Sequence, residues 1–549
     1  MNVSEYLLSR LKSLNVEHIF GVPGDFILPF FESLESNDIK HVLTCNELNA
    51  GYAADGYARL RGLGVAAVTY GPGAFSLVNA FAGAHAEDVP LIVISGGPAT
   101  VAYKSDPHPV LHHLLTENYV AQVNIFKQIT KHVYFLDNPK TATTEIDEAL
   151  TICLSQKKPV FLEIPKDIQL HTVDEPAPLD IPAYVISDAK ATDSVITQLI
   201  ERIVEGERTV ILPGHEIHRR NLQDKVIDLL QTTGLPAATM FVGKSEYLEH
   251  LPNCIGAYQG AASNEEVRQY VETADTVIYL GAVPSDLNLG GFTAKLAKDQ
   301  TVTVWNNKVE MAQGTFNNVS IVEFMDELLA RLPATFKQND DRPVQCFAHK
   351  PDSKYVVNND EQLTSKRFYD RLANFIQPND IVLGDAGCAF NLTYVQFPEN
   401  TDFIASNYWA SIGMGFGAAV GACFAASDDQ RVIAVEGDGS FQMTAQELST
   451  MIRYGKAPIV FIVNNKGYTA ERFIHDGEFN DIPQWKYHKL PDTFGGGTGI
   501  EVRTEGELES ALEKAIAGAN SELLLIEVHL DPYDVSEGFQ AMCQAFRSH

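Results

Sequence analysis

The sequence predicts an α/β protein made of repeated, doubly wound parallel sheets, and three observations support this fold class. Short runs rich in Val, Ile and Leu alternate with helical stretches along the whole chain, as is typical of parallel sheets buried on both faces. Two polar linkers divide the chain into thirds, and the first and last thirds repeat one strand–turn–helix–strand unit. We therefore expect three such domains, with the first and third similar.

Apolar runs mark the expected strands. Ten examples, in chain order, are VAAVTY (65–70), PLIVISG (90–96), PVFLEIP (159–165), TVILPG (209–214), TVIYLGA (276–282), TVTVW (301–305), DIVLGD (380–385), RVIAVEG (431–437), PIVFIVNN (458–465) and LLLIEVHL (523–530). At the N-terminus, Val3, Leu7, Leu11 and Leu14 share one helical face, which predicts an amphipathic first helix and not a signal peptide. The apolar run 412–426, rich in Gly and Ala, is too short to cross a bilayer and predicts a closely packed, buried helix.

The linkers set the expected domain bounds. A chain of 549 residues is too long for one hydrophobic core, and three domains are the natural expectation. The stretch 171–187 is acidic and rich in Pro, and 337–362 is polar and aperiodic. The predicted domains are 1–175, 188–336 and 360–549.

The repeated unit indicates a duplicated domain. In the first third, Gly71 of the Gly-x-Gly turn precedes Pro90 by 19 positions; in the last third, Gly437 precedes Pro458 by 21. A single matching pair of units could also arise by coincidence in an α/β protein. Two features occur only in the second copy: an Asp between the glycines, and Asn-Asn at the end of the following strand.

Charge and cysteine content exclude several classes of function. The formal net charge of −30 argues against nucleic acid or an anionic membrane as a partner. It also means that any anion site must be built locally. The seven Cys residues show no CxxC pair and no framework spacing, so we expect reduced thiols and a cytoplasmic protein.

The GDGS segment and the Asn pair predict a Mg²⁺–diphosphate site. Asp438 and Asn465 are 27 positions apart, but each follows a strand, and the carboxyl ends of parallel strands share one edge where ligands bind. Carboxylate and amide oxygens with room for phosphate oxygens suit Mg²⁺, and a following helix from about Phe441 would offer amide groups to an anion. The alternative is an Asp that caps a helix, followed by a polar turn.

GDGS followed at this distance by NN resembles the thiamin diphosphate signature, and the resemblance covers essentially the whole chain. FGVPGDF, CNELNAGYAADGYAR, VLHH, NNKGYTAERFIHDG and IPQWKYHKLPDTFG are similar to segments of the 2-keto acid decarboxylases. The resemblance implies non-oxidative decarboxylation of a 2-oxo acid to an aldehyde and CO₂ through a covalent thiamin diphosphate adduct. It further implies pyrimidine-binding, middle and diphosphate-binding domains, an active site shared between subunits, a homodimer at minimum and an expected homotetramer.

The resemblance also assigns five catalytic residues, each of which has a simpler explanation. Glu47 would act on the aminopyrimidine ring, but also suits the first turn of a helix. Asp25 would lie at the reacting carbon, but also suits a helix N-cap. His112 and His113 would transfer protons near neutral pH, although a surface loop or a metal site would also explain them. Glu471 would lie beside the substrate carboxylate, unless it is an exposed helical residue.

The remaining site residues follow from the same motifs. The cofactor is expected to contact Glu47, Cys388, Ala389, Ser411, Ile412, Gly437, Asp438, Gly439, Ser440, Asn465, Gly467 and Tyr468, and the metal to be held by Asp438, Asn465 and Gly467. Ile412 matches the bulky residue that props the cofactor in a bent shape. Cys388 and Ala389 depart from the Asp, Thr or Ser of relatives, which puts those contacts in doubt, and Ala410 replaces a frequent Gly.

Substrate size depends on a separate set of positions. The pocket is expected to be lined by Phe390, Ala470, Ile474, Met542 and Phe546, the last two on one face of a C-terminal helix. Pyruvate-specialised relatives often carry Ile at the position of Ala470, so we expect a roomier pocket for branched, long-chain or aromatic 2-oxo acids. Compensating packing elsewhere, a pyruvate decarboxylase, or a carboligating thiamin diphosphate enzyme are the alternatives.

Overall fold

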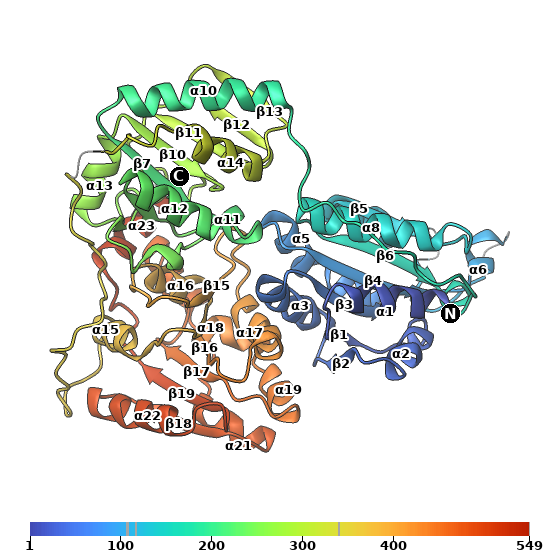
Figure 1. Ribbon diagram of the computed structural model, residues 1–549. Helices are drawn as coiled ribbons and strands as arrows, with labels where there is room; N and C mark the ends of the chain where they lie inside the picture. Colours follow the sequence, from blue (N-terminus) through green and yellow to red (C-terminus); the bar gives the residue numbers. More distant parts are fainter. Residues whose placement is uncertain (106–108, 116–117, 339–340, 548–549) are drawn as a thin grey trace. The chain divides into compact units, whose positions relative to one another are not determined.

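The structure is a computed structural model that describes residues 1–105, 109–115, 118–338 and 341–547. The chain forms two compact units, which we describe separately. One contains 1–185, 413–427 and 444–456, and the other contains 186–412, 428–443 and 457–549. Three sheets with helices on both faces confirm the predicted α/β fold class (Figure 1).

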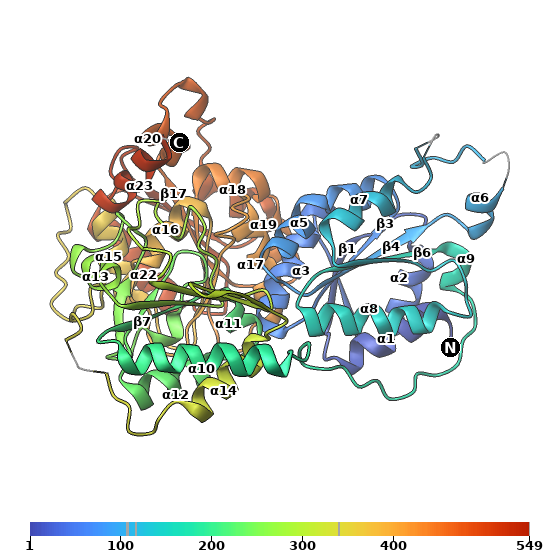
Figure 2. The same cartoon turned by 90° about the horizontal axis from the view of Figure 1, so that it is seen from above.

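The first sheet is entirely parallel, with strand order β2-β1-β3-β4-β6-β5. Its strands are β1 (His18–Val22), β2 (Lys40–Leu43), β3 (Gly64–Thr69), β4 (Leu91–Gly97), β5 (His132–Phe135) and β6 (Val160–Pro165). The helices around it are α1 (Val3–Ser13), α2 (Leu28–Glu35), α3 (Glu47–Arg61), α4 (Pro72–Ser76), α5 (Val78–Ala86), α6 (Thr100–Lys104), α7 (Ala121–Ile129), α8 (Ala142–Gln156) and α9 (Lys166–Gln169). Helices α1 and α8 cover one face, and α3, α5 and α7 cover the other (Figure 2).

The third sheet repeats the topology of the first. Its order is β15-β14-β16-β17-β19-β18, which becomes 2-1-3-4-6-5 when the strands are renumbered from one. The strands are β14 (Ile381–Gly384), β15 (Asp402–Ile404), β16 (Val432–Gly437), β17 (Ile459–Asn464), β18 (Thr498–Val502) and β19 (Leu524–His529). The repeated unit lies on β3–β4 and on β16–β17, the third and fourth strands of each sheet, so the predicted similarity of the two domains is confirmed.

The helices of the third region include the one expected from the Gly- and Ala-rich run. They are α15 (Ser365–Phe375), α16 (Ala386–Thr393), α17 (Met414–Ala425), α18 (Asp438–Thr444), α19 (Glu447–Arg453), α20 (Thr469–Ile474), α21 (Leu490–Phe494), α22 (Glu505–Ala517) and α23 (Glu537–Arg547), with short 3₁₀ turns η2 (Glu478–Asn480) and η3 (Tyr487–Lys489). Every residue of α17 is buried. The packing is tight, because a Cβ on Gly421 would lie 1.8 Å from the Ala53 carbonyl oxygen.

The middle sheet departs from a purely parallel arrangement at one edge. Its order is β13-β12-β11-β10-β7-β8-β9, and β12 and β13 run antiparallel. The strands are β7 (Thr209–Pro213), β8 (Ala237–Thr239), β9 (Cys254–Ala257), β10 (Thr276–Leu280), β11 (Thr301–Trp305), β12 (Lys308–Met311) and β13 (Gly314–Asn317). The helices are α10 (Ala189–Glu205), α11 (His215–Arg219), α12 (Gln223–Thr233), α13 (Glu265–Glu272) and α14 (Ile321–Arg331), with the 3₁₀ turn η1 (Glu246–Leu248).

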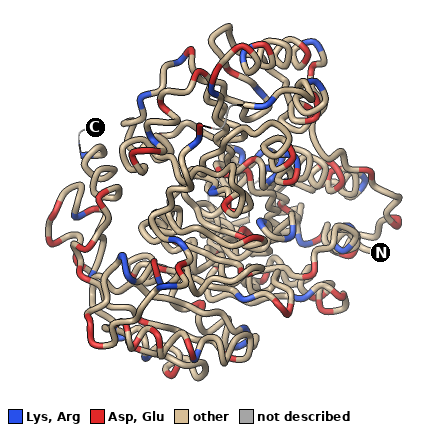
Figure 3. Tube along the Cα trace, turned by 60° about the vertical axis from the view of Figure 1, so that its left-hand side comes forward, with Lys and Arg blue, Asp and Glu red and all other residues tan. Residues whose placement is uncertain are grey.

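Charged residues are distributed along the whole trace (Figure 3). Together with the net charge of −30, this distribution provides no long-range attraction for an anionic substrate. Within the described residues, no helix is both long enough and apolar enough to cross a membrane.

Candidate active site

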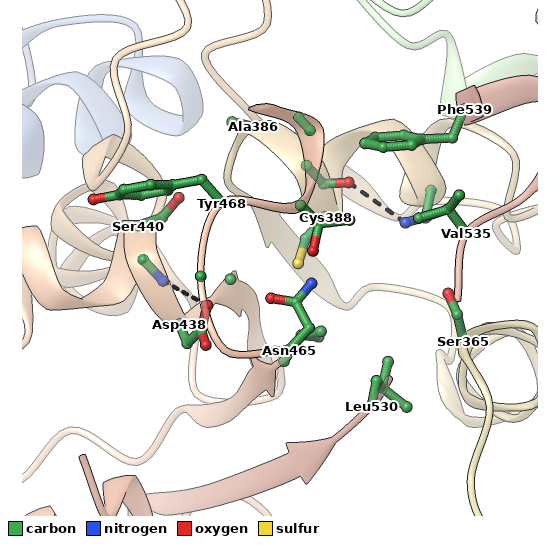
Figure 4. Close-up of a pocket in the computed structure, with 18 of the residues that line it drawn as sticks. Ser365, Ala386, Cys388, Asp438, Ser440, Asn465, Tyr468, Leu530, Val535 and Phe539 are labelled. Carbon is green, nitrogen blue, oxygen red and sulfur yellow. Dashed lines mark hydrogen bonds between the residues drawn. The ribbon is translucent and has the colours of Figure 1, made fainter. Parts of the chain in front are cut away.

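Two neighbouring strand ends create the proposed metal site. Strands β16 and β17 are parallel, with Gly437 opposite Val463, so the residues that follow both strands meet at the carboxyl edge of the sheet. Figure 4 shows the side chains of Asp438 and Asn465 pointing toward one another. Helix α18 begins at Asp438 itself, three residues earlier than expected.

Asp438 is a fully buried carboxylate, and one of its two oxygens lacks a hydrogen-bond partner among the described residues. Its Oδ1 accepts a hydrogen bond from the Gly439 amide at 2.8 Å, whereas Oδ2 has no hydrogen-bond partner among the described residues. Burial raises the pKa of Asp438 to about 7, although the amides of Gly439, Lys466 and Gly467 act to lower it. A bound cation would stabilise the ionised form of such a buried carboxyl group and so lower its pKa.

The amide of Asn465 completes a group of oxygens. In one orientation its oxygen lies 3.3 Å from Asp438 Oδ1 and 3.0 Å from the Gly467 carbonyl oxygen; rotated by 180°, its nitrogen donates to both. Without a cation the second orientation is favoured, because the nitrogen then donates to both oxygens and the amide oxygen accepts from Thr469 Oγ1 at 2.9 Å. A bound cation would favour the first orientation, in which three oxygens face one another. Adjacent ligands of octahedral Mg²⁺ are about 3 Å apart, given Mg–O distances near 2.1 Å, so this arrangement fits Mg²⁺ with little adjustment.

Arg472 holds the turn that presents these oxygens, and sequence reasoning missed it. Its guanidinium donates to the carbonyl oxygens of Asn465 at 3.1 Å and Lys466 at 2.6 Å, and pairs with Asp481 at 2.8 Å. Gly467 has φ 139°, and a Cβ there would lie 2.1 Å from the Asn480 carbonyl oxygen, so only glycine fits. The position of Arg472 directly after Glu471 is the one signal that could have identified it.

One pocket gathers most of the predicted cofactor residues. Those that line it are Cys388, Ile412, Gly437, Asp438, Gly439, Ser440, Asn465, Gly467 and Tyr468. Ala389 is instead fully buried behind the pocket, and Ser411 precedes Ile412 without lining it. Burial raises the pKa of the Cys388 thiol, so this side chain is neutral.

The pocket wall also has open positions that the motifs did not indicate. A Cβ on Gly437 or Gly387 would meet nothing within 4 Å, so backbone faces free space at the end of β16 and in the first turn of α16. Ser365, Asp531 and Asp534 also line the pocket and were missed. This combination of exposed backbone and a buried acid fits a diphosphate held with Mg²⁺.

Glu47 begins α3 in the other compact unit. A Cβ on Gly73 would lie 3.5 Å from Glu47 Oε1, so the carboxylate adjoins the Gly-x-Gly turn after β3. Glu447, which sequence reasoning missed, anchors the start of α3. Its Oε1 accepts from the Cys45 amide at 3.0 Å and from Asn49 Nδ2 at 2.7 Å.

Asp25 and the His pair form a group in the same unit as Glu47. His112 Nε2 lies 3.0 Å from Asp25 Oδ2, and His113 Nε2 lies 4.0 Å from Asp25 Oδ1. The ring of Phe26 stacks on His112 with centroids 5.2 Å apart. Asp25 is not a helix cap, because α2 begins at Leu28 with Ile27 at the N-cap.

The five predicted substrate residues belong to one apolar cluster beside the pocket. Ala470 and the exposed Glu471 line the pocket itself. Phe390 and Met542 are buried, and Ile474 and Phe546 are partly buried. Met542 and Phe546 both lie on α23.

Ala410 adopts the left-handed backbone conformation, with φ 55°. An L-residue is strained there, whereas glycine is not. We expect Ala410→Gly to raise the free energy of unfolding by about 1 kcal/mol, as measured by the urea midpoint. Ala511→Gly, inside α22, should lower it by a similar amount; stabilisation by both changes, or by neither, would contradict the strain argument.

Comparisons with known families agree with this geometry. The thiamine pyrophosphate enzyme N-terminal TPP binding domain matches residues 1–124, the central domain matches 196–332 and the C-terminal TPP binding domain matches 385–528. The chain thus has the three domains of a thiamine pyrophosphate enzyme.

Full-length relatives narrow the class. A pyruvate decarboxylase of Aspergillus fumigatus is 32% identical over 100% of this chain and 97% of its own length. An alpha-keto-acid decarboxylase of Mycobacterium tuberculosis is 34% identical over 97% of this chain and 95% of its own. A pyruvate decarboxylase of Kluyveromyces marxianus is 32% identical, with 99% and 98% covered. The chain therefore belongs to the thiamin diphosphate-dependent 2-oxo acid decarboxylases.

Proposed function

We propose that this decarboxylase converts a 2-oxo acid to an aldehyde and CO₂. The diphosphate group of its cofactor, thiamin diphosphate, would be anchored through Mg²⁺ held by Asp438, Asn465 and Gly467. The observation that carries the proposal is the buried carboxylate of Asp438, whose Oδ2 has no hydrogen-bond partner among the described residues. The amide of Asn465 and the carbonyl group of Gly467 lie beside this carboxylate. Cys388, Ile412, Gly437, Gly439, Ser440 and Tyr468 line the same pocket and would contact the cofactor.

The catalytic roles follow from where the side chains lie. Thiamin diphosphate, when bound, supplies an electron sink for the reacting carbon. Glu47 would hold a proton at the aminopyrimidine ring. Asp25, His112 and His113 lie close together, with His112 Nε2 3.0 Å and His113 Nε2 4.0 Å from the Asp25 carboxylate, and they would move a proton to the product. Glu471 at the pocket wall would disfavour the charged carboxylate relative to neutral CO₂.

The organisation of the chain extends this proposal. We assign pyrimidine binding to 1–175, a middle domain to 188–336 and diphosphate binding to 360–549. We further propose a homodimer at minimum, and a homotetramer in solution, because the family's active site is shared between subunits. A cytoplasmic location is supported by seven cysteines that are all free thiols.

Asp438→Ala tests the metal assignment. It removes the charged ligand, so thiamin diphosphate affinity in excess Mg²⁺ should fall at least about tenfold, or roughly 1.4 kcal/mol. Calorimetric titration of the apoprotein is the measurement. Asp531→Ala, which changes another acid of the pocket wall, is the matched control and should retain the affinity; unchanged binding by Asp438→Ala would place the metal elsewhere.

Substrate choice depends on Ala470. We propose that the enzyme favours branched, long-chain or aromatic 2-oxo acids, because a small side chain lines the pocket next to Glu471. The second candidate is pyruvate, and it is favoured by the names of the Aspergillus and Kluyveromyces relatives.

Ala470→Ile distinguishes the two candidates. It adds three carbon atoms, and at about 0.8 kcal/mol per buried methylene the filled space is worth on the order of 2 kcal/mol. We expect kcat/KM for a bulky substrate such as phenylpyruvate to fall at least about tenfold, while pyruvate turnover holds or improves. Equal changes in kcat/KM for both substrates would show that Ala470 does not select substrates by size, since overpacking lowers kcat/KM for both alike.

A further inference from the structure

A second buried carboxylate lies behind the turn at residues 465–467, which presents the proposed metal ligands. Glu527, on β19, has a side chain only 2% exposed, and its two oxygens are both hydrogen-bonded. Oε1 accepts from Asn464 Nδ2 at 2.7 Å. Oε2 accepts from the His488 amide at 3.1 Å, and the ring Nδ1 of His488 lies 2.5 Å away.

Asn464 is the first member of the Asn pair, for which the metal site gives no role. It is the last residue of β17, and its carbonyl oxygen accepts from the Leu530 amide at 3.1 Å. Its side chain turns away from the metal oxygens toward Glu527, while the side chain of the next residue, Asn465, faces Asp438. The two amides therefore have different partners on opposite sides of the strand end.

The cluster around Glu527 continues toward the surface. His529 Nε2 lies 3.0 Å from Glu501 Oε1 and 3.3 Å from Glu527 Oε1, and Arg503 donates to Glu501 at 2.7 Å. His488, Glu501 and Glu527 are close enough to hold a metal ion. However, the guanidinium of Arg503 already neutralises Glu501 and would repel a dication. The cluster is therefore better explained as a hydrogen-bond network.

We propose that Glu527, acting through Asn464, is a positioning residue that fixes the end of β17 and thereby the oxygens of Asn465 and Gly467. This inference rests on the proposed Mg²⁺ site and adds the group that orients it. Arg472 holds the outer side of the same turn by its carbonyl groups. Glu527 holds the inner side, so the turn is fixed from both directions.

Fixing the turn should matter for the choice of metal. Mg²⁺ requires near-ideal octahedral geometry at 2.0–2.1 Å, whereas Ca²⁺ accepts irregular coordination at longer distances. Loss of an outer hydrogen-bond partner typically lowers metal affinity about 10–100-fold. A loosened turn should therefore lose Mg²⁺ affinity while retaining more of its affinity for Ca²⁺.

The experiment measures Mg²⁺ and Ca²⁺ binding by calorimetry to the apoprotein saturated with thiamin diphosphate. In Asn464→Ala and Glu527→Gln we expect Mg²⁺ affinity to fall at least about tenfold, and Ca²⁺ affinity to fall less than about threefold. Asn464→Ala loses one side-chain hydrogen bond and is the deciding variant if Glu527→Gln does not fold.

Asp380→Asn is the matched control. Asp380 is a buried carboxylate paired with Arg431 at 2.8 Å. It directly precedes β14 and so lies at the amino ends of the strands of the same sheet, away from the carboxyl ends where the metal site is proposed. It should lower stability without altering the ratio of Mg²⁺ to Ca²⁺ affinity.

The outcomes separate the two claims. Unchanged Mg²⁺ affinity in Asp438→Ala would overturn the metal site itself. If Asp438→Ala lowers Mg²⁺ affinity but Asn464→Ala leaves the ratio of Mg²⁺ to Ca²⁺ affinity unchanged, only the positioning role would be overturned. An equal change of the ratio in Asp380→Asn would also overturn it, because the effect would then report only lost stability.

Discussion

Glu47→Gln is expected to lower kcat by about 10²–10⁴-fold, the usual contribution of general acid–base catalysis. The amide keeps the shape of the side chain but cannot hold and release a proton at the cofactor ring. Glu47 is the first residue of α3, and the lost interaction with the helix dipole amounts to only about 0.3–1 kcal/mol. The variant should therefore fold and bind thiamin diphosphate.

Steady-state kinetics on the reconstituted enzyme are the measurement. Glu5→Gln is the matched control, because Glu5 also lies in the first turn of a helix and its capping hydrogen bond to the Asn2 amide can be kept by an amide. It should retain kcat within about threefold. Near-normal turnover by Glu47→Gln would remove Glu47 from the catalytic residues.

Lys244→Met is expected to lower the free energy of unfolding by about 3–5 kcal/mol, because it leaves a buried carboxylate unpaired. Lys244 and Glu249 are both fully buried, and Lys244 Nζ lies 2.5 Å from Glu249 Oε1. The ammonium also donates to the carbonyl oxygens of Val395 at 2.8 Å and Thr393 at 3.3 Å. Glu249 Oε2 accepts from the Phe397 amide at 2.8 Å.

This ion pair joins the middle region to the end of α16, the helix that carries Cys388. Urea unfolding followed by circular dichroism measures the loss. Lys225→Met breaks an exposed pair with Asp326 and should cost less than about 1 kcal/mol. The double variant Lys244→Met/Glu249→Leu should recover part of the loss, since no charge remains buried; a double variant less stable than either single variant would contradict this account.

The sequence predicted the parts of the fold that a local pattern can specify. All ten apolar runs are strands of the three sheets, and the run 412–426 contains the buried helix α17. The hairpin of β12 and β13 was missed because its strands, KVEM and GTFN, are short, polar and at a sheet edge, where neither face needs to be fully apolar.

Some site residues could likewise be identified from local sequence patterns, and others could not. Asp438 and Asn465 could be paired from the sequence because both follow strands whose ends must meet. Glu527 and Glu447 could not, because their hydrogen-bond partners are distant in the sequence. Arg472 bonds carbonyl groups only six and seven residues earlier, but within an ordinary helical pattern its position beside Glu471 was the one available signal. The N-cap alternative for Asp25 failed because a turn at residues 25–27 precedes α2.

Turnover of a panel of 2-oxo acids tests the central claim most directly. The purified protein with thiamin diphosphate and Mg²⁺ would be given pyruvate, a branched-chain 2-oxo acid, phenylpyruvate and indolepyruvate, and CO₂ and aldehyde would be quantified. We predict one aldehyde per CO₂, with a higher kcat/KM for at least one bulky substrate than for pyruvate. Acyloin as the main product, or no CO₂ from any of the four, would contradict the assignment as an aldehyde-releasing decarboxylase.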